Sequence, residues 1–358
     1  MIGKRLLEQG IKIRRIPELG YYAVWFNGKT WRLDLGDQPE GTDPLPLPPD
    51  RSEFFDVGIN NLCGLQCSYC YTSAGKDGKN WPSPGETWKR WMETYQPNIE
   101  GPDTGDEVWA ELMKESVDTD KPEMIELKGI LQIFHKKLGL PVKYTEKAYQ
   151  IAIGSTGEPT IHPEFVQFLQ TVSETGVIPN YTTNGLNLAD PKTNGPLLEA
   201  TAKYCAGVAV SYSNPIARPK AKIAIKNLLE KGQCKVMVHH IISDRASIDE
   251  FVQLAKDWGD DIHYHVLLPL MAHGRSREAM DPESFPYLAE MIHREGLEKR
   301  IALGANFAPY LRQDPSLLPV WEYPSETYSK NVLLKSQEEI IITPSSFDLT
   351  PCKVISLS

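Results

Sequence analysis

Residues 60–71 read Asn-Asn-Leu-Cys-Gly-Leu-Gln-Cys-Ser-Tyr-Cys-Tyr, and they place Cys63, Cys67 and Cys70 within eight positions of one another. Thiolate sulfur is the soft ligand that iron-sulfur clusters and zinc require. The spacing of three and then two intervening residues predicts a short loop wrapped around one point. The stretch therefore predicts a metal centre.

Zinc and an iron-sulfur cluster differ in the number of protein ligands that they need. A structural zinc site takes four ligands, usually as two separated pairs. The next cysteine is Cys205 and the nearest following histidine is His135, so zinc fits poorly. A four-iron cubane held by three thiolates keeps one iron open for a substrate or cofactor atom, as catalysis requires. We therefore favour the cluster over zinc and over three unrelated buried cysteines.

The stretch Cys63-Gly-Leu-Gln-Cys67-Ser-Tyr69-Cys70 resembles the C-x3-C-x-aromatic-C motif of the radical S-adenosylmethionine (radical SAM) superfamily. It follows the apolar run 54–59, as the motif follows the first strand of that family's barrel. The resemblance implies a [4Fe-4S] cluster on the three cysteines, S-adenosylmethionine on the fourth iron, and Tyr69 beside the cofactor. Reductive cleavage would then give a 5′-deoxyadenosyl radical that abstracts hydrogen from substrate, with flavodoxin or ferredoxin as a typical electron donor.

Composition narrows the class of protein. The net charge of -9 and the pI near 5.5 argue against a broad nucleic-acid-binding surface. No apolar run approaches the roughly 20 residues that span a bilayer. Six cysteines, three of them clustered, suit a reducing compartment better than a disulfide framework. We expect a cytoplasmic protein with no membrane contact.

Residues 1–50 predict a small N-terminal appendage. Two β-rich runs within 20–35 flank Asn27-Gly28, a strong hairpin signal. The segment 37–50 carries five prolines and predicts an extended linker to the main domain. The aromatic residues of the hairpin are expected to pack onto the barrel rather than to touch substrate; they are Tyr21, Tyr22, Trp25 and Trp31.

Residues 72–122 predict an insertion after the cysteine loop. The segment is rich in Gly, Pro, Asp and Trp and shows two short helical patterns, near 87–95 and 106–115. A long irregular segment of this kind suits a substrate lid, or a surface subdomain whose tryptophans pack together. The tryptophans concerned are Trp81, Trp88, Trp91 and Trp109. The apolar pattern from Pro122 to Gly139 then predicts the first barrel helix.

The chain from residue 149 onward alternates strand and helix patterns. Together with the strand before Cys63, the pattern gives six β/α units and predicts a parallel sheet with its chemistry at the C-terminal strand ends. The fold class is α/β, a partial (β/α)6 TIM-type barrel over 51–275, which is also the plan of radical SAM enzymes. The predicted strands are 149–153, 178–182, 207–212, 235–242 and 262–268, and the predicted helices are 163–174, 195–204, 220–231 and 248–258.

The segment after the second strand, Gly154-Ser-Thr-Gly-Glu-Pro159, resembles the glycine-rich G-G-E-P segment of the radical SAM family. By that resemblance, Gly157, Glu158 and Pro159 bind the cofactor. Backbone carbonyls and a carboxylate suit its ammonium group, because they accept hydrogen bonds and Glu158 offsets the charge.

Small polar residues end the next two strands. Thr183 and Asn184 resemble the family's T-N-G ending, although Asn184 before Gly185 also fits an ordinary turn. The resemblance makes these two residues, together with Ser211 and Ser213, candidates for the carboxylate and ribose of S-adenosylmethionine. Leu268, within an apolar run that Gly274-Arg275 closes, is the candidate for the adenine.

Four histidines fall within two predicted strands: His239, His240, His263 and His265. Alternate residues of a strand share a face, so His263 and His265 should face the same side. If that side lines the barrel, they are candidates for proton transfer or substrate binding. A structural role for hydrogen-bonded histidines is the more common outcome. No lysine lies in a recognisable pyridoxal phosphate context.

Residues 276–358 predict a C-terminal extension with a helix near 282–298. The ending Pro351-Cys352 resembles the SPASM or twitch extensions that carry auxiliary clusters in peptide-modifying members of the family. Only Cys352 matches, because Cys205 and Cys234 fall inside barrel units. A degenerate extension without metal is therefore expected.

The sequence favours a radical SAM enzyme acting on a peptide or an amino-acid-containing substrate. A radical isomerase of a nucleotide or other small metabolite is the second interpretation. A non-catalytic, metal-stabilised binding protein is the alternative of another class.

Overall fold

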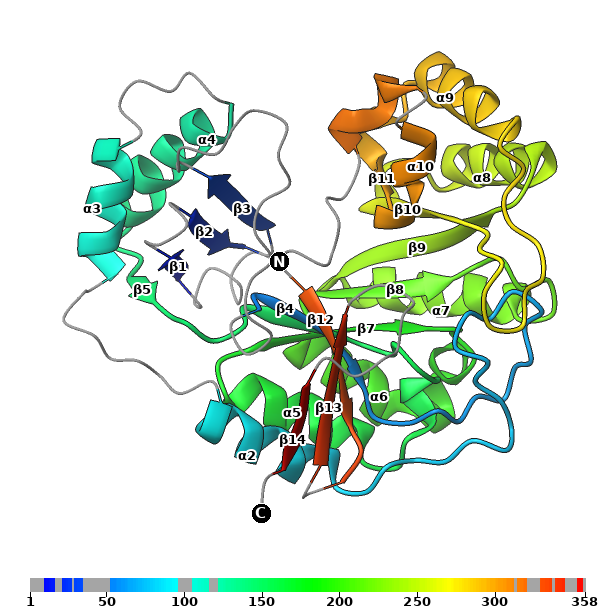
Figure 1. Ribbon diagram of the computed structural model, residues 1–358, viewed down its shortest axis with the longest axis horizontal. Helices are drawn as coiled ribbons and strands as arrows, with labels where there is room; N and C mark the ends of the chain where they lie inside the picture. The colour runs from blue at the N-terminus through cyan, green and yellow to red at the C-terminus, as the bar shows by residue number, and fades with distance from the viewer. Residues whose placement is uncertain are drawn as a thin grey trace.

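The computed structural model describes residues 10–16, 21–27, 29–34, 52–95, 105–115, 122–311, 314–320, 329–336, 339–344 and 353–356. Two sheets organise these residues (Figure 1). The larger has ten strands in the order β11-β10-β9-β8-β7-β6-β4-β12-β13-β14, and the smaller has four in the order β3-β2-β1-β5.

Six neighbouring strands of the large sheet, β4 and β6 to β10, run parallel and form the partial barrel. Within the described residues the end strands β11 and β14 do not pair with each other, so the barrel stays open. This architecture confirms the predicted fold class. The six strands are β4 (Phe54–Gly58), β6 (Gln150–Ile153), β7 (Ile178–Thr183), β8 (Gly207–Ser211), β9 (Lys235–Ile242) and β10 (Tyr264–Pro269).

Helices cover the outer face of the barrel because alternate strand residues are apolar and point toward them. In β9, for example, Val236 and Val238 are fully buried in the outer core, and the intervening residues are only partly buried. Burial of such apolar side chains stabilises each by about 1.5–3 kcal/mol. The covering helices are α2 (Pro84–Tyr95), α5 (Phe165–Glu174), α6 (Pro191–Tyr204), α7 (Arg218–Lys231), α8 (Arg245–Trp258) and α9 (Ser284–Glu295).

The C-terminal part prolongs the large sheet on both sides. Strand β11 (Ile301–Leu303) pairs parallel with β10, and the short helix α10 (Ala308–Leu311) follows it. On the other side β12 (Ser329–Leu334) pairs parallel with β4, and β13 (Glu339–Pro344) and β14 (Lys353–Ser356) continue antiparallel. A SPASM-like or twitch-like identity of this region stays a prediction, and Cys352 and the linker 37–50 lie outside the described residues.

The small sheet joins the N-terminal appendage to the inserted segment. Strands β2 (Tyr21–Phe26) and β3 (Lys29–Asp34) form the expected hairpin around Asn27. Strand β1 (Ile11–Ile16) pairs antiparallel with β2 and parallel with β5 (Val142–Tyr144). Helices α3 (Gly105–Glu115) and α4 (Pro122–Ile130), the latter continued by a π-helical segment over Leu131–Lys137, share a core with this sheet.

The prediction that the helix from Pro122 onward is the first barrel helix is wrong. Leu127 and Ile130 of α4 pack with the small sheet, whereas α2 covers the barrel. The four tryptophans of the predicted insertion are all buried, so their side chains pack and do not form an exposed lid. Trp88 and Trp91 belong to the barrel core, Trp109 to the core of the small sheet, and Trp81 is 2% exposed.

The small sheet packs against the barrel at the N-terminal ends of the strands. Tyr21, Ala23 and Trp25 of β2 share a buried cluster with Tyr149, Ile178 and Ala206, which lie at or just before the starts of β6, β7 and β8. Tyr22 and Trp31 pack in the core that the small sheet shares with α3 and α4, whereas Tyr21 and Trp25 pack onto the barrel, as expected. This contact lies at the opposite end of the barrel from the loops that follow the strands.

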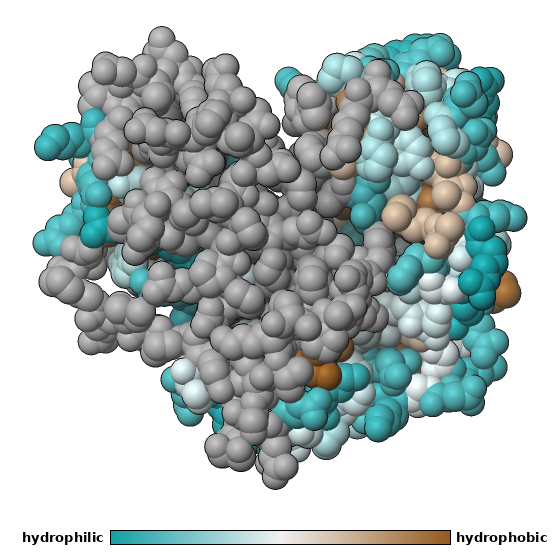
Figure 2. Space-filling model, in the orientation of Figure 1, coloured by the Kyte–Doolittle hydropathy of each residue, from teal (hydrophilic) through white to brown (hydrophobic). Residues whose placement is uncertain are grey.

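The described surface gives no sign of a membrane-spanning element. None of the described helices is both long and apolar enough to cross a bilayer. On the face shown in Figure 2, most described residues are hydrophilic or of intermediate hydropathy, and apolar residues occur in small groups.

Candidate metal centre

The cysteine loop follows β4 at the C-terminal edge of the barrel strands. Hydrogen bonds fold it onto the segment 75–80: Asn61 N donates to Lys79 O (3.1 Å) and Cys63 N donates to Gly75 O (3.0 Å). Cys70 N donates to Cys67 O (3.2 Å), which closes a tight turn between the last two cysteines. The loop thus has a defined backbone conformation that does not depend on disulfides.

All three cysteines of the loop are free thiols and partly buried. Burial raises the pKa of Cys63 to about 11, and the negative charges of Glu158, Cys67 and Cys70 add to that rise. The Cys67 sulfur lies 3.0 Å from Asn214 Nδ2, and the Cys70 sulfur lies 3.5 Å from Thr72 Oγ1. The structure therefore brings the three sulfurs into one electrostatic neighbourhood.

The thiols are not arranged as a mononuclear metal site. Among the residues that the structure describes, no three side chains of His, Cys, Asp or Glu are placed to hold a single metal ion. A tetrahedral zinc site needs every sulfur at about 2.3 Å from one point. In a cubane each thiolate binds its own iron, so the sulfurs need not converge in that way. Three thiolates on one loop match the protein ligands that a cubane with one open iron requires.

Arg275 lies on the loop after β10, the last of the six barrel strands, and its side chain binds the cysteine loop that follows the first. Its guanidinium donates to Cys67 O (2.9 Å), Ser73 O (3.1 Å) and Ala74 O (2.7 Å), and its backbone N donates to Cys70 O (3.0 Å). The planar fork of arginine suits several acceptors at once. The preceding Gly274 lies so close that a Cβ there would be 2.3 Å from Tyr71 O.

The segment after β6 is tied to the same loop. Thr156 Oγ1 donates to Asn60 O (2.6 Å), and Asn60 Nδ2 donates to Glu158 O (2.9 Å). A Cβ on Gly157 would lie 2.3 Å from Asn60 Oδ1, so glycine is required there. Pro159 begins a short 3-10 turn, Pro159–Ile161, and is buried. The glycine-rich segment therefore lies directly against the cysteine loop.

Glu158 is buried and its carboxylate is fully engaged. One oxygen accepts hydrogen bonds from Thr160 N, Thr160 Oγ1 and Thr183 Oγ1 (3.2, 2.5 and 2.7 Å), and the other accepts from Asn184 N (2.8 Å). Burial raises the pKa of Glu158, whereas these hydrogen bonds oppose the rise. The structure thus brings Glu158, Thr183 and Asn184 together at the strand ends. Their hydrogen bonds there are to one another.

The remaining cofactor candidates lie on the neighbouring strand ends. Ser211 lies on the inner face of β8, because its neighbour Val210 is buried in the outer core. Ser213 Oγ accepts a hydrogen bond from Ile241 N (2.7 Å). Leu268 lies on the inner face of β10, since Leu267 is in the outer core. Burial raises the pKa of Tyr69, and a hydrogen bond with Cys67 adds to that rise.

The histidines separate into different environments. His265 is fully buried on the outer face, where its Nδ1 lies 3.1 Å from Nε2 of His240 and both rings contact Phe251. His263 Nδ1 accepts a hydrogen bond from Val236 N (3.2 Å). His265 is thus hydrogen-bonded on the outer face, so the condition for a role of His265 in the lining of the barrel is not met.

His239 is the histidine on the inner face of β9. It pairs in register with Ser211 of β8 and Val266 of β10, whereas its neighbours Val238 and His240 are buried on the other side. Burial lowers the pKa of His239 to about 4, so its ring is neutral at pH 7. A neutral imidazole in the barrel both donates and accepts hydrogen bonds.

Three positioning residues escaped the sequence analysis: Asn60, Asn214 and Arg275. Their partners are 98, 147 and 208 positions away in the sequence, so no local pattern shows these contacts. The Gly274-Arg275 step was the available signal for Arg275, because a glycine at a strand end often marks a close backbone approach.

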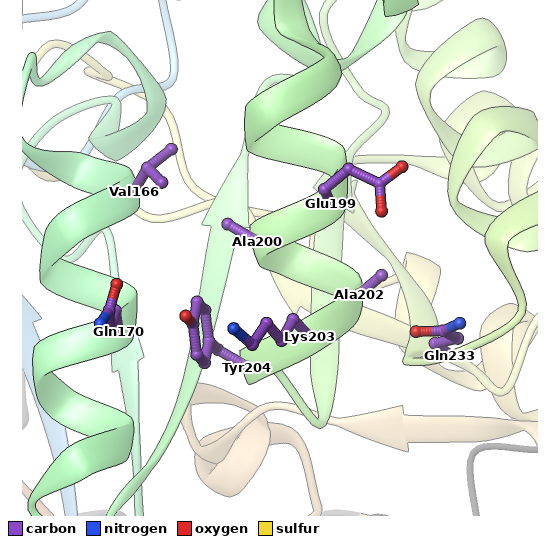
Figure 3. A pocket seen from close by; sticks show the side chains of 8 residues that line it. All are labelled: Val166, Gln170, Glu199, Ala200, Ala202, Lys203, Tyr204 and Gln233. Atoms are coloured by element: carbon purple, nitrogen blue, oxygen red, sulfur yellow. The ribbon is translucent and has the colours of Figure 1, made fainter.

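A surface groove of about 510 Å³ lies elsewhere, on the outer helical layer (Figure 3). Its walls come from the outer sides of α5 and α6, with Gln233 before β9. The cysteine loop lies at the strand ends, so the groove is separate from the candidate centre.

No protein-family profile and no curated protein sequence matches the chain. Solved structures do. Streptococcus suis SuiB bound to S-adenosylmethionine superposes with a TM-score of 0.50 at 12% identity, over 81% of this chain and 60% of SuiB. SuiB bound to the precursor peptide SuiA gives a TM-score of 0.51 at 12% identity, over 81% and 59%. The likeness confirms the fold, and the chain spans about 60% of the length of SuiB.

Proposed function

We propose that this chain is a radical SAM enzyme in which Cys63, Cys67 and Cys70 hold a [4Fe-4S] cluster. The carrying observation is the set of three free, partly buried thiols on one loop at the C-terminal edge of an open parallel barrel. Enzymes of barrel type place their chemistry at that edge. The fold shared with SuiB, which has been solved with S-adenosylmethionine, supports the same assignment.

With the cluster and S-adenosylmethionine bound, the site would supply one-electron cleavage of the sulfonium and a 5′-deoxyadenosyl radical that abstracts hydrogen from substrate. The chain's own residues hold and orient these groups. Gly157 and Pro159 set the path of the segment beside the cysteine loop, and Tyr69 and Leu268 would border the bound cofactor. Ser211 and Ser213 present hydroxyl groups on the strand ends.

Glu158, Thr183 and Asn184 act in this proposal mainly as a framework. The buried carboxyl group joins the ends of β6 and β7 through its hydrogen bonds with Thr183 and Asn184. It thereby fixes the strand ends beside which the cofactor would bind.

We propose a peptide or an amino-acid-containing substrate for the inner face of the barrel. The SuiB structure with its precursor peptide supports this class for the shared fold. His239 and Ser211, adjacent across β8 and β9, offer the substrate hydrogen-bonding groups on this face. An external reductant such as flavodoxin or ferredoxin, in the cytoplasm, completes the proposal.

Anaerobic reconstitution with iron and sulfide tests the proposal. The wild-type protein should become brown, absorb near ~400 nm and form 5′-deoxyadenosine from S-adenosylmethionine after reduction. Cys67→Ala should reduce that product to the level without protein, because one iron loses its only protein ligand. Cys234→Ala, which removes a buried cysteine outside the loop, should retain cluster and cleavage.

A colourless protein that binds zinc stoichiometrically would contradict the proposal and favour the metal-stabilised binding protein. Full cleavage by the Cys67→Ala variant would contradict the cluster assignment. Deuterated peptides and deuterated nucleosides then separate the substrate classes, because the class that delivers deuterium into 5′-deoxyadenosine is the one attacked.

A further inference from the structure

Asn214 connects the end of β8 to the sulfur of Cys67. The residue lies three positions after Ser211, and its Nδ2 is 3.0 Å from Cys67 Sγ. Its backbone carbonyl accepts a hydrogen bond from Arg218 N (2.9 Å) in the first turn of α7. The backbone of Asn214 is therefore fixed at the N-terminus of α7, and its side chain points at a candidate cluster ligand.

The orientation of the Asn214 amide follows from its other contacts. Oδ1 accepts hydrogen bonds from Ile216 N (2.9 Å) and Ala217 N (3.2 Å). These backbone groups are donors only, so the oxygen must face them and the NH2 group must face the sulfur. The contact is thus an N–H···S hydrogen bond in which asparagine donates.

The three sulfurs differ in their donors. Cys67 receives the amide of Asn214 at 3.0 Å, whereas Cys70 has the hydroxyl of Thr72 at 3.5 Å. Hydrogen bonds to cluster sulfurs help to set reduction potentials. They stabilise the reduced cluster more, because it carries one more negative charge.

We propose that Asn214 raises the reduction potential of the cluster by donating this hydrogen bond to Cys67, as a positioning and tuning residue. The inference rests on the proposed function, since it requires a cluster on the three cysteines. It adds a role for a residue that lies outside the cysteine motif and outside the expected cofactor contacts.

Two substitutions remove the donor and keep the local turn. In Asn214→Ser the hydroxyl still accepts from the backbone at Ile216 and Ala217 but is too short to reach the sulfur. Asn214→Asp keeps the acceptor oxygen and replaces the donor with a negative charge. Asn227→Ser is the control, because the Asn227 amide donates to Leu188 O (2.8 Å) and to no sulfur.

The experiment is a redox titration of each reconstituted protein without S-adenosylmethionine, read by electron paramagnetic resonance of the loaded fraction. Relative to wild type, Asn214→Ser should lower the equilibrium constant for one-electron reduction about tenfold, equal to a potential lower by ~59 mV. Asn214→Asp should lower it further, and Asn227→Ser should match wild type.

Unchanged potentials in both Asn214 variants, with a loaded wild-type protein, would overturn this inference and leave the proposed function standing. A wild-type protein that takes up no cluster would overturn both. Partial loading of a variant does not obscure the result, because the potential is measured on the clusters that are present.

Discussion

Gly274 lies where the end of β10 comes closest to the cysteine loop. Its φ is +64°, and a Cβ there would meet Tyr71 O at 2.3 Å and Cys70 O at 2.4 Å. Left-handed backbone costs a non-glycine residue about 1–2 kcal/mol, and the overlap with backbone atoms adds to this. We expect Gly274→Ala to destabilise the protein by at least ~3 kcal/mol in urea unfolding and to lower its iron content.

The control for this prediction is Gly296→Ala. Gly296 has φ +63° at the end of α9, and a Cβ on this residue would have no neighbouring atom within 4 Å. This variant should cost only the backbone term, about 1–2 kcal/mol, and should load iron normally. Equal losses of stability in the two variants would show that the close approach at Gly274 has no energetic importance.

At the scale of single residues, the sequence predicted which residue types belong to the site better than it predicted the direction in which a side chain points. The three cysteines and Glu158 stand out from the sequence because of their spacing and neighbours. His265 faces outward together with Leu267, two residues further along β10. A shift of one residue in a strand exchanges its two faces, so a histidine near a strand end is hard to assign.

At the scale of elements, β12 extends the large sheet directly beside the first barrel strand. It pairs parallel with β4, and Leu334 is fully buried in the barrel core. We expect Leu334→Ala to destabilise the whole barrel by about 2–5 kcal/mol, because it leaves a cavity in that core. Urea unfolding followed by circular dichroism and by tryptophan fluorescence should give coincident, shifted transitions.

Ile216→Ala is the comparison for Leu334→Ala, because Ile216 is 85% exposed. Its effect should stay within about 0.5 kcal/mol. If Leu334→Ala instead produced an early transition in circular dichroism while the fluorescence of the buried tryptophans stayed unchanged, β12 to β14 would unfold independently of the barrel.

The helices and strands after residue 149 were predictable because each has its own periodicity and turn residues. Strand β9 occupies the predicted residues 235–242, and α5 to α8 overlap their predicted ranges. The assignment of α2 and α4 to different cores was not predictable in this way. Both helices are amphipathic or apolar, and a helical pattern does not state which sheet it covers.

At the scale of the whole molecule, Lys12 connects the small sheet to the barrel. Its Nζ donates to Gly176 O (2.7 Å) and lies 5.1 Å from the centroid of the Trp25 ring. Burial lowers the pKa of Lys12 to about 8, and the charge of Lys143 contributes. The lysine is only 6% exposed, so its charge destabilises the interface in which it is buried.

The lowered pKa of Lys12 gives a pH dependence of stability with a definite sign. Between about pH 8 and the ordinary value of 10.5, the unfolded chain keeps the proton that the folded chain releases, so stability rises with pH. Relative to Lys12→Met, the wild-type free energy of unfolding should rise by up to ~3 kcal/mol across this window. Urea unfolding of both proteins at several pH values measures the difference, and parallel curves would contradict the prediction.

The sequence by itself determined the three-cysteine motif, the α/β class and the order of the barrel elements, because thiol spacing and residue periodicity are local properties of the chain. Only the tertiary structure decided how Arg275 and Asn214 reach the cysteine loop, which face each histidine occupies, and where the inserted helices pack. These features depend on contacts between residues far apart in the sequence, and such contacts exist only once the strands are in register.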